Sequence, residues 1–173
     1  MEIRKAKKED IRSVVRIYDS IHDLEEEGIL TIGWQKGVYP TEKTALEALS
    51  RDDLYVIVDN DVVIGSAVLN KRQVDVYSKA SWAYEAKSEE VFVMHTLTLD
   101  PRVNGKGYGS AFVKFYEEEA KRQCAKVLRM DTNKINTRAR CLYRKLGYEE
   151  AGIIPCSFNG IAGVDLVLLE KKI

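Results

Sequence analysis

The sequence predicts an α/β fold, more closely an α+β arrangement of strands flanked by helices. Short apolar or alternating runs, typical of strands, are interleaved with segments whose apolar residues recur every three or four positions, as in amphipathic helices. These elements follow the order β-α-α-β-β-β-α-β-α-β-β over 173 residues. We found no repeat, linker or low-complexity segment, so residues 1–173 are expected to form a single domain with its own core.

The N-terminal half is expected to supply two helices and three strands. Alternation over residues 2–6 predicts a first strand. An acidic start and apolar helical spacing predict a helix from Lys8 to about Gly28, where glycine can end it. Thr41 can cap a second, short helix. Two apolar runs on either side of Asn60-Asp61 then predict a β-hairpin.

The centre of the chain combines a strand, a glycine-rich turn and a helix. Val91 to Leu99 is apolar and β-branched, which predicts a buried strand, and Asp100-Pro101 ends it. Glycines stand at positions 105, 107 and 109, and an apolar stripe at helical spacing follows up to Ala120. Glycines let a backbone approach a ligand closely, and the first N–H groups of a helix are unpaired and partly positive. The unit is therefore predicted to bind an anion.

Two common phosphate-binding motifs are excluded at this turn. The Rossmann spacing would need glycine at position 110 or 112, where Ser110 and Phe112 stand. The P-loop requires Gly-Lys-Ser/Thr, but Gly107 follows Lys106. C-terminal to this unit, the pattern predicts a strand over 127–131, a helix over 136–146, and strands over 148–154 and 163–170.

Residues 104–109, Asn-Gly-Lys-Gly-Tyr-Gly, resemble the acyl-CoA loop of the GCN5-related N-acetyltransferase (GNAT) superfamily, Gln/Arg-x-x-Gly-x-Gly/Ala, with Asn104 at its first position. Residues 136–148 resemble a second CoA-contacting segment, Asn-x-x-Ala-x-x-Leu-Tyr-x-Lys-Leu-Gly-Phe/Tyr, at every named position. The order of elements also matches the superfamily over nearly the whole chain. The resemblance implies a mixed, mostly antiparallel sheet that splays open between its fourth and fifth strands. It also implies transfer of an acetyl group from acetyl-CoA to a primary amine, directly in a ternary complex.

The resemblance also implies the residues that bind the cofactor. The turn would hold the pyrophosphate, the central strand would pair with the pantetheine, and an amide near Leu97 would polarise the thioester carbonyl. The implied cofactor-binding residues are Leu97, Thr98, Leu99, Asn104, Gly105, Lys106, Gly107, Tyr108, Gly109, Ser110, Asn136 and Ala139. Tyr143 matches the tyrosine that protonates the CoA sulfur in many relatives, and a phenol is protonated at neutral pH. No metal and no covalent enzyme intermediate are expected.

The group that deprotonates the amine is left open. His95 lies in the central strand, where some relatives carry a catalytic His or Glu, and an ordinary imidazole pKa of about 6.5 suits a base. The alternative for His95 is a hydrogen-bonded core residue. Other candidate bases are Glu25, Glu26, Glu27 and Glu90, although the first three also fit a solvated helix end. Four aromatic residues could wall an acceptor pocket or pack down their own loops: Trp34, Tyr39, Trp82 and Tyr84.

Charge and composition limit the partners. The 27 basic and 27 acidic residues cancel, but they are unevenly distributed. Residues Asp100 to Gly147 include 12 Lys/Arg and 5 Asp/Glu, so the rest of the chain has 15 basic and 22 acidic residues. The basic half suits a cofactor with several phosphates, and no nucleic-acid motif accompanies it. The acidic remainder favours a cationic amine, on either a small molecule or a protein. We expect a cytoplasmic protein that binds neither nucleic acid nor membrane, because no apolar run is long enough to span a bilayer and the 3 cysteines have no metal-ligand spacing.

Two further points follow from the resemblance. Dimers are common among the relatives, so a homodimer is compatible with the sequence. The alternative function is a non-catalytic acyl-CoA-binding or sensing module of the same fold. The tyrosine at position 143 argues against that alternative, since a binding module needs no proton donor.

Overall fold

The computed structural model describes residues 1–103 and 105–173, which form a seven-stranded sheet flanked by helices. The strands are β1 (Glu2–Lys5), β2 (Leu54–Asp59), β3 (Val62–Asn70), β4 (Val91–Leu99), β5 (Val127–Asn133), β6 (Glu149–Phe158) and β7 (Ile161–Lys172). The helices are α1 (Ile11–Glu26), α2 (Glu42–Ser50), α3 (Tyr108–Arg122) and α4 (Thr137–Lys145). The strand order is β1-β2-β3-β4-β5-β7-β6, with β4 and β5 parallel and all other pairs antiparallel. The mixed, mostly antiparallel sheet expected from the sequence is confirmed.

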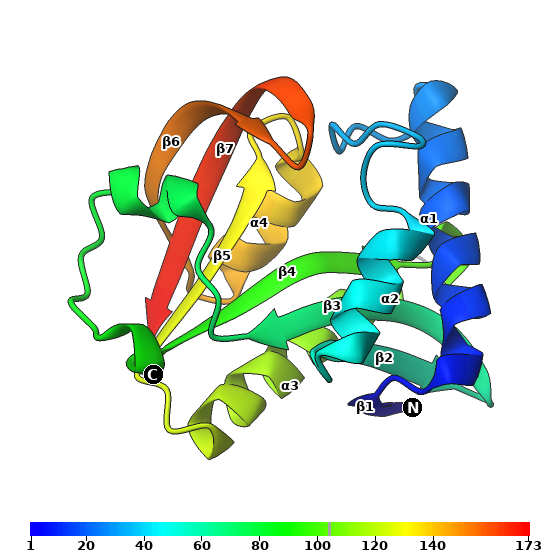
Figure 1. Cartoon of the computed structure of the whole chain (residues 1–173), viewed down its shortest axis with the longest axis horizontal. Coiled ribbons are helices and arrows are strands. Elements are labelled where there is room, and N and C mark those ends of the chain that lie inside the picture. Colours follow the sequence, from blue (N-terminus) through cyan, green and yellow to red (C-terminus); the bar gives the residue numbers. More distant parts are fainter. Residues whose placement is uncertain (104) are drawn as a thin grey trace.

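Helices cover both faces of the sheet (Figure 1). Alternate residues of β2 show the two layers: Leu54 packs in a core with α1 and α2, whereas Ile57 belongs to the opposite core. Phe112 and Tyr116 of α3 fill that opposite core, and Tyr143 of α4 joins it. No helix in the described residues is both long and apolar enough to cross a membrane.

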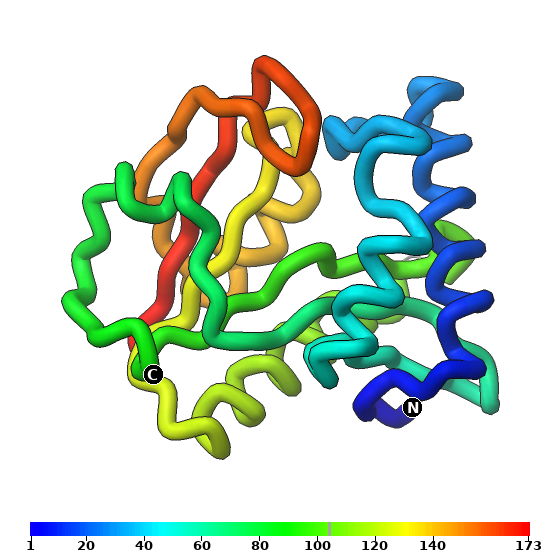
Figure 2. Tube along the Cα trace, in the orientation of Figure 1, coloured from blue at the N-terminus to red at the C-terminus, as the bar shows by residue number. Residues whose placement is uncertain are grey.

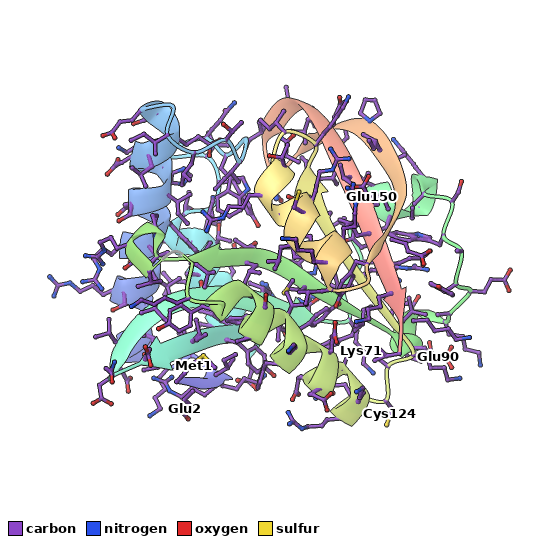
Figure 3. The ribbon with its side chains drawn as sticks, turned by 180° about the vertical axis from the view of Figure 1, so that it is seen from behind. Met1, Glu2, Lys71, Glu90, Cys124 and Glu150 are labelled. Carbon is purple, nitrogen blue, oxygen red and sulfur yellow. The ribbon has the colours of Figure 1, made fainter. Side chains whose placement is uncertain are left out.

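Residues 71–90 cover the face of the C-terminal strands that α1 and α2 leave open. They form two short 3-10 turns and pack on apolar side chains of β4, β5 and β7. The guanidinium carbon of Arg129, on β5, lies 4.0 Å from the ring centroid of Trp82. Lys71 donates to the carbonyl of Glu89 at 2.8 Å and so ties the two ends of this segment together. Figure 3 labels Lys71 and Glu90, which stand at these two ends. The segment is therefore packed against the sheet as a layer of the fold.

Strands β4 and β5 start side by side and then separate (Figure 2). Their last paired residues are Met94 and Met130. Beyond that pair β4 keeps only β3 as a neighbour, while residues 131–133 pair with β7 alone. Thr96 has a φ of 52° and lies where β4 carries one residue more than the facing stretch of β3. Such a bulge bends its strand, and the splay expected between the fourth and fifth strands is present.

The C-terminal hairpin is longer than the sequence pattern predicted. The expected strands ended at 154 and resumed at 163, but β6 continues to Phe158 and β7 begins at Ile161. Pro155 does not end β6, because β6 is an edge strand, where a missing N–H need not break a ladder. Asn159-Gly160 forms the turn with φ values of 51° and 80°, the geometry of a two-residue hairpin loop.

Candidate active site

A cleft of about 1220 Å³ opens where β4 and β5 separate. At one end the cleft is lined by the turn before α3 and by α4. At the other end it is lined by residues 30–34 and by the tip of the β6–β7 hairpin. Its basic lining residues are Lys43, Arg51, Arg72, Lys106, Arg138 and Lys145, and its acidic ones are Glu47 and Asp131. This excess of positive charge favours an anionic ligand.

The turn before α3 presents backbone amides to the cleft. Gly105 and Gly107 have φ values of 80° and 79°, a left-handed conformation that glycine adopts without strain. A Cβ at either position would have no atom within 4 Å, so space beside this backbone is open. Gly107 is the N-cap of α3, and among the described residues no side chain caps the helix. The amides of the first turn, from Tyr108 to Ser110, are therefore available to a ligand's acceptor atoms.

The predicted cofactor-binding residues, apart from one, line this cleft. They are Leu97, Thr98, Leu99, Gly105, Lys106, Gly107, Tyr108, Gly109, Ser110, Asn136 and Ala139. Asn104 lies outside the described residues. The hydroxyl of Tyr108 donates to the Asp59 carboxylate at 2.6 Å, and the Asn136 Oδ1 accepts from the Ala139 amide at 3.1 Å as the N-cap of α4. Asn136 thus starts the helix that positions Tyr143.

Tyr143, the predicted proton donor, lies on α4 and is 5% exposed. Its ring packs edge-on against Tyr148, with the ring centroids 6.1 Å apart. The residue lines the cleft, and its hydroxyl has no hydrogen-bond partner in the described part of the chain. Burial, and then the nearby charge of Asp131, raise the pKa of Tyr143 above its ordinary value. The phenol therefore stays protonated at neutral pH and can donate to a ligand.

His95 lies in β4, directly before the bulge, and lines the cleft. Its Nε2 is 3.2 Å from the Oδ1 of Asn70 and 3.1 Å from the carbonyl oxygen of Arg72. Both partners are acceptors, so Nε2 carries the proton and Nδ1 keeps a lone pair. Burial lowers the pKa of His95 to about 4. The imidazole is therefore neutral at physiological pH and a weaker base than the sequence alone suggested.

The glutamates considered as alternative bases lie outside the cleft formed by the described residues. Glu26 pairs with Lys36 at 3.4 Å on the surface, and Glu27 is exposed at the end of α1. Glu90 pairs with Lys126 at 2.5 Å. These carboxylates are engaged by surface cations or solvent, which leaves them no direct route to a reacting amine.

Glu25 instead shapes the wall of the cleft. Its carboxylate accepts backbone N–H groups from Ile32 at 2.9 Å, from Gly33, and from Trp34 at 3.3 Å. These three residues line the cleft. One side chain on α1 therefore anchors this part of the wall.

Replacing Glu25 with alanine should lower Tm by roughly 3 to 8 °C, because three partly buried N–H groups lose their acceptor. The matched control is Glu26→Ala, which removes only a surface ion pair and should change Tm by less than about 1 °C. Calorimetric melting of both variants is the measurement. Equal melting temperatures for the two variants would show that Glu25 does not anchor the wall.

The four loop aromatics have divided roles. Trp34 and Tyr39 line the cleft, with ring centroids 6.1 Å apart, and the hydroxyls of Tyr39 and Thr96 share a hydrogen bond. That bond connects residues 30–40 to the bulge in β4. Trp82 and Tyr84 lie outside this cleft and pack in the layer formed by residues 71–90. The pocket-wall interpretation fits the first pair and the loop-packing interpretation fits the second.

Asp131 is a cleft residue that sequence reasoning did not single out. It follows Met130, the last residue of β5 that pairs with β4. The hydroxyl of Tyr77 donates to its carboxylate at 2.8 Å. Burial raises the pKa of Asp131 to about 6. The sequence signal, an acidic residue after an apolar strand, fits an ordinary strand end equally well.

Solved structures share this fold. An acetyltransferase of the GNAT family from Streptococcus agalactiae superposes with a TM-score of 0.83 at 20% identity, over 99% of this chain and 95% of that one. The ribosomal-protein-alanine N-acetyltransferase of Brucella melitensis gives 0.71 at 21% identity over 100% of both chains. The yncA protein of Salmonella typhimurium, solved with its cofactor acetyl-CoA, gives 0.72 at 18% identity, over 99% of this chain and 93% of that one. At these identities the likeness shows the fold alone.

Sequence comparison gives the family. No curated protein matches the chain. The model of the Acetyltransferase (GNAT) family matches residues 16–148, which include the glycine-rich turn, both separating strands and Tyr143. This match covers more than half of the 173 residues. The chain therefore belongs to the GNAT family of acetyltransferases.

Proposed function

We propose that this protein is an acetyl-CoA-dependent N-acetyltransferase that moves an acetyl group to a primary amine by direct transfer in a ternary complex. Residues 1–173 would act as one N-acetyltransferase domain. The observation that carries the proposal is that one cleft is lined both by the first turn of α3, whose amides no described side chain caps, and by Tyr143. The first suits the phosphates of the cofactor, and the second suits its sulfur.

The separated part of β4 supports this placement of the cofactor. From His95 to Leu99 the strand has no β5 partner, so an extended pantetheine arm can pair with its free edge. The pyrophosphate would then meet the amides between Gly107 and Ser110. An amide near Leu97 would lie beside the thioester carbonyl and stabilise the oxyanion that forms there.

The reaction then requires three proton transfers. The amine nitrogen attacks the thioester carbon, the C–S bond breaks, and the departing sulfur takes the phenolic proton of Tyr143. Tyr143 regains a proton from the nitrogen of the new amide, directly or through solvent. Earlier, the acceptor must lose a proton from its ammonium form. His95 and Asp131 are the two candidates for this first step within the cleft. The mechanism needs no metal and no covalent enzyme intermediate.

The acceptor is proposed to be a cationic primary amine, carried by a small molecule or a protein. Outside residues 100–147 the chain has 15 basic and 22 acidic residues, which favours a positively charged partner. We also propose a cytoplasmic location, which the free thiols of its cysteines favour. Neither nucleic acid nor membrane is proposed as a partner, and a homodimer is compatible with the proposal.

The proposal is tested by measuring thiol release from acetyl-CoA in the presence of a panel of primary amines. The panel should include polyamines, amino acids, aminoglycosides and lysine peptides. We expect at least one amine to raise thiol release well above the rate with acetyl-CoA alone. Tight acetyl-CoA binding without release for any amine would instead indicate an acyl-CoA-binding module.

A further inference from the structure

His95 and Asp131 occupy equivalent positions where the sheet divides. Each directly follows the last residue paired between β4 and β5, namely Met94 and Met130. Because side chains alternate along a strand, Asp131 points to the same face as Arg129, which is the face covered by residues 71–90. Asp131 therefore borders the gap between the strands on the face opposite α3.

The titratable side chains around the carboxylate of Asp131 are not cationic, so they do not offset its negative charge. The titratable groups around it are Tyr77 of residues 71–90, Tyr39 of the cleft wall, Tyr143 of α4 and Cys156 of β6, and its charge raises the pKa of all four. Among them, Tyr77 gives it a hydrogen bond. The His95 imidazole is instead influenced by Asp53 and Arg51.

No ion pair to Asp131 is present among the described residues. Asp131 is partly buried, and a carboxylate withdrawn from water in a protein is normally paired with a cation. Here the residue lines an open cleft, so a ligand can supply that cation. Asp131 also lines the same cleft as Tyr143, the proposed proton donor.

We propose that Asp131 binds the ammonium group of the acceptor and takes its proton before the amine attacks the thioester. This inference rests on the proposed N-acetyltransferase function and deepens it. One N–H bond of the ammonium breaks, its electron pair stays on nitrogen, and the proton forms an O–H bond on Asp131. That proton passes to solvent after the products leave, so each turnover releases one proton.

Asp131 suits this step better than His95. The carboxylate attracts a cation before it accepts a proton, whereas a neutral imidazole does not. A base also works best when its pKa lies near the working pH, and the pKa is about 6 for Asp131 against about 4 for His95.

The first test is Asp131→Asn, which keeps the shape of the side chain and removes its charge. With an amine that the wild type acetylates, kcat/KM should fall by about 100- to 10,000-fold, the usual effect of losing a general base. The affinity for acetyl-CoA should stay unchanged. The matched control is Asp165→Asn on β7, which removes a half-exposed carboxylate paired with Lys134 at 3.3 Å and should keep wild-type activity.

The second test uses the pH dependence of kcat/KM. In the wild type it should rise with pH and level off above about 6, because the carboxylate is the active form. Tyr77→Phe removes the hydrogen bond that favours the carboxylate, so it should raise the pKa of Asp131. The rising limb of the kcat/KM profile should then shift to higher pH by roughly 0.4 to 1 unit. His95→Gln should retain the limb near pH 6, whatever its effect on the rate.

The outcomes separate this inference from the function on which it rests. If the wild type acetylates no amine, the proposed function fails and the role of Asp131 fails with it. If the wild type turns over and folded Asp131→Asn keeps its rate and pH limb, only the assignment of Asp131 is overturned. Loss of the limb in His95→Gln would likewise overturn it and assign the proton to His95.

Discussion

Gly107→Val should weaken acetyl-CoA binding by at least about 100-fold while the domain stays folded. Gly107 has a φ of 79° at the N-cap of α3, a conformation that costs a β-branched residue on the order of 1–3 kcal/mol. A Cβ there would meet no protein atom within 4 Å, so it would project into open space beside the amides. In the proposed complex that space holds the pyrophosphate. The variant therefore loses both the backbone geometry and the room for its ligand.

Calorimetric titration with acetyl-CoA measures this effect, and Gly28→Val is its matched control. Gly28 has a φ of 72° after the end of α1, and a Cβ there would also meet no atom within 4 Å. The control should lose a similar amount of stability but bind acetyl-CoA as the wild type does. Unchanged affinity in folded Gly107→Val would mean that the cofactor does not depend on this turn.

Tyr143→Phe should preserve folding and acetyl-CoA affinity but lower kcat by roughly 10- to 1,000-fold. The hydroxyl has no partner to lose among the described residues, and the ring keeps its contact with Tyr148. The effect should stay within this range for a physical reason. The pKa of Tyr143 is raised above 10, whereas a thiol has a pKa of about 8.5, so thiolate can leave without a proton at some rate.

Steady-state kinetics with a known acceptor measures this loss, and Tyr148→Phe is the control. Tyr148 is a buried tyrosine outside the cleft whose hydroxyl donates to Glu117 at 3.2 Å. Its variant should lose some stability and keep kcat. A wild-type kcat in Tyr143→Phe would assign the proton to another donor and leave Tyr143 as part of the cleft wall.

The core of the fold was predictable because its signals are local. The strand expected from Val91 to Leu99 is β4 within the same limits, and α3 begins at Tyr108 beside the glycines that allow the turn. Asn60 and Asp61 form the expected hairpin turn with φ values of 48° and 60°. These elements follow from the backbone preferences of neighbouring residues, which a sequence displays directly.

The site could be predicted only in part, because its electrostatics depend on contacts distant in sequence. Asp131 accepts a hydrogen bond from Tyr77, 54 residues away, and the sequence around neither residue predicts that contact. The strand that holds His95 was expected to be buried, but the sequence did not show that burial outweighs its hydrogen bond to Arg72, 23 residues away, and so lowers the pKa of His95. The positive φ of Thr96 likewise accompanies a hydrogen bond to Tyr39, 57 residues distant. Sequence reasoning therefore found the turn before α3 and the helix α4 that line the cleft but missed Asp131.

The central claim is that the cleft between β4 and β5 catalyses acetyl transfer to an amine. The most direct measurement is mass spectrometry of amines incubated with the protein and isotopically labelled acetyl-CoA, with thiol release followed in parallel. We expect the label to appear on one class of primary amine in step with the released thiol, and none to remain on the protein. Saturating acetyl-CoA binding with no label on any amine, or label that passes through a protein side chain, would contradict the account.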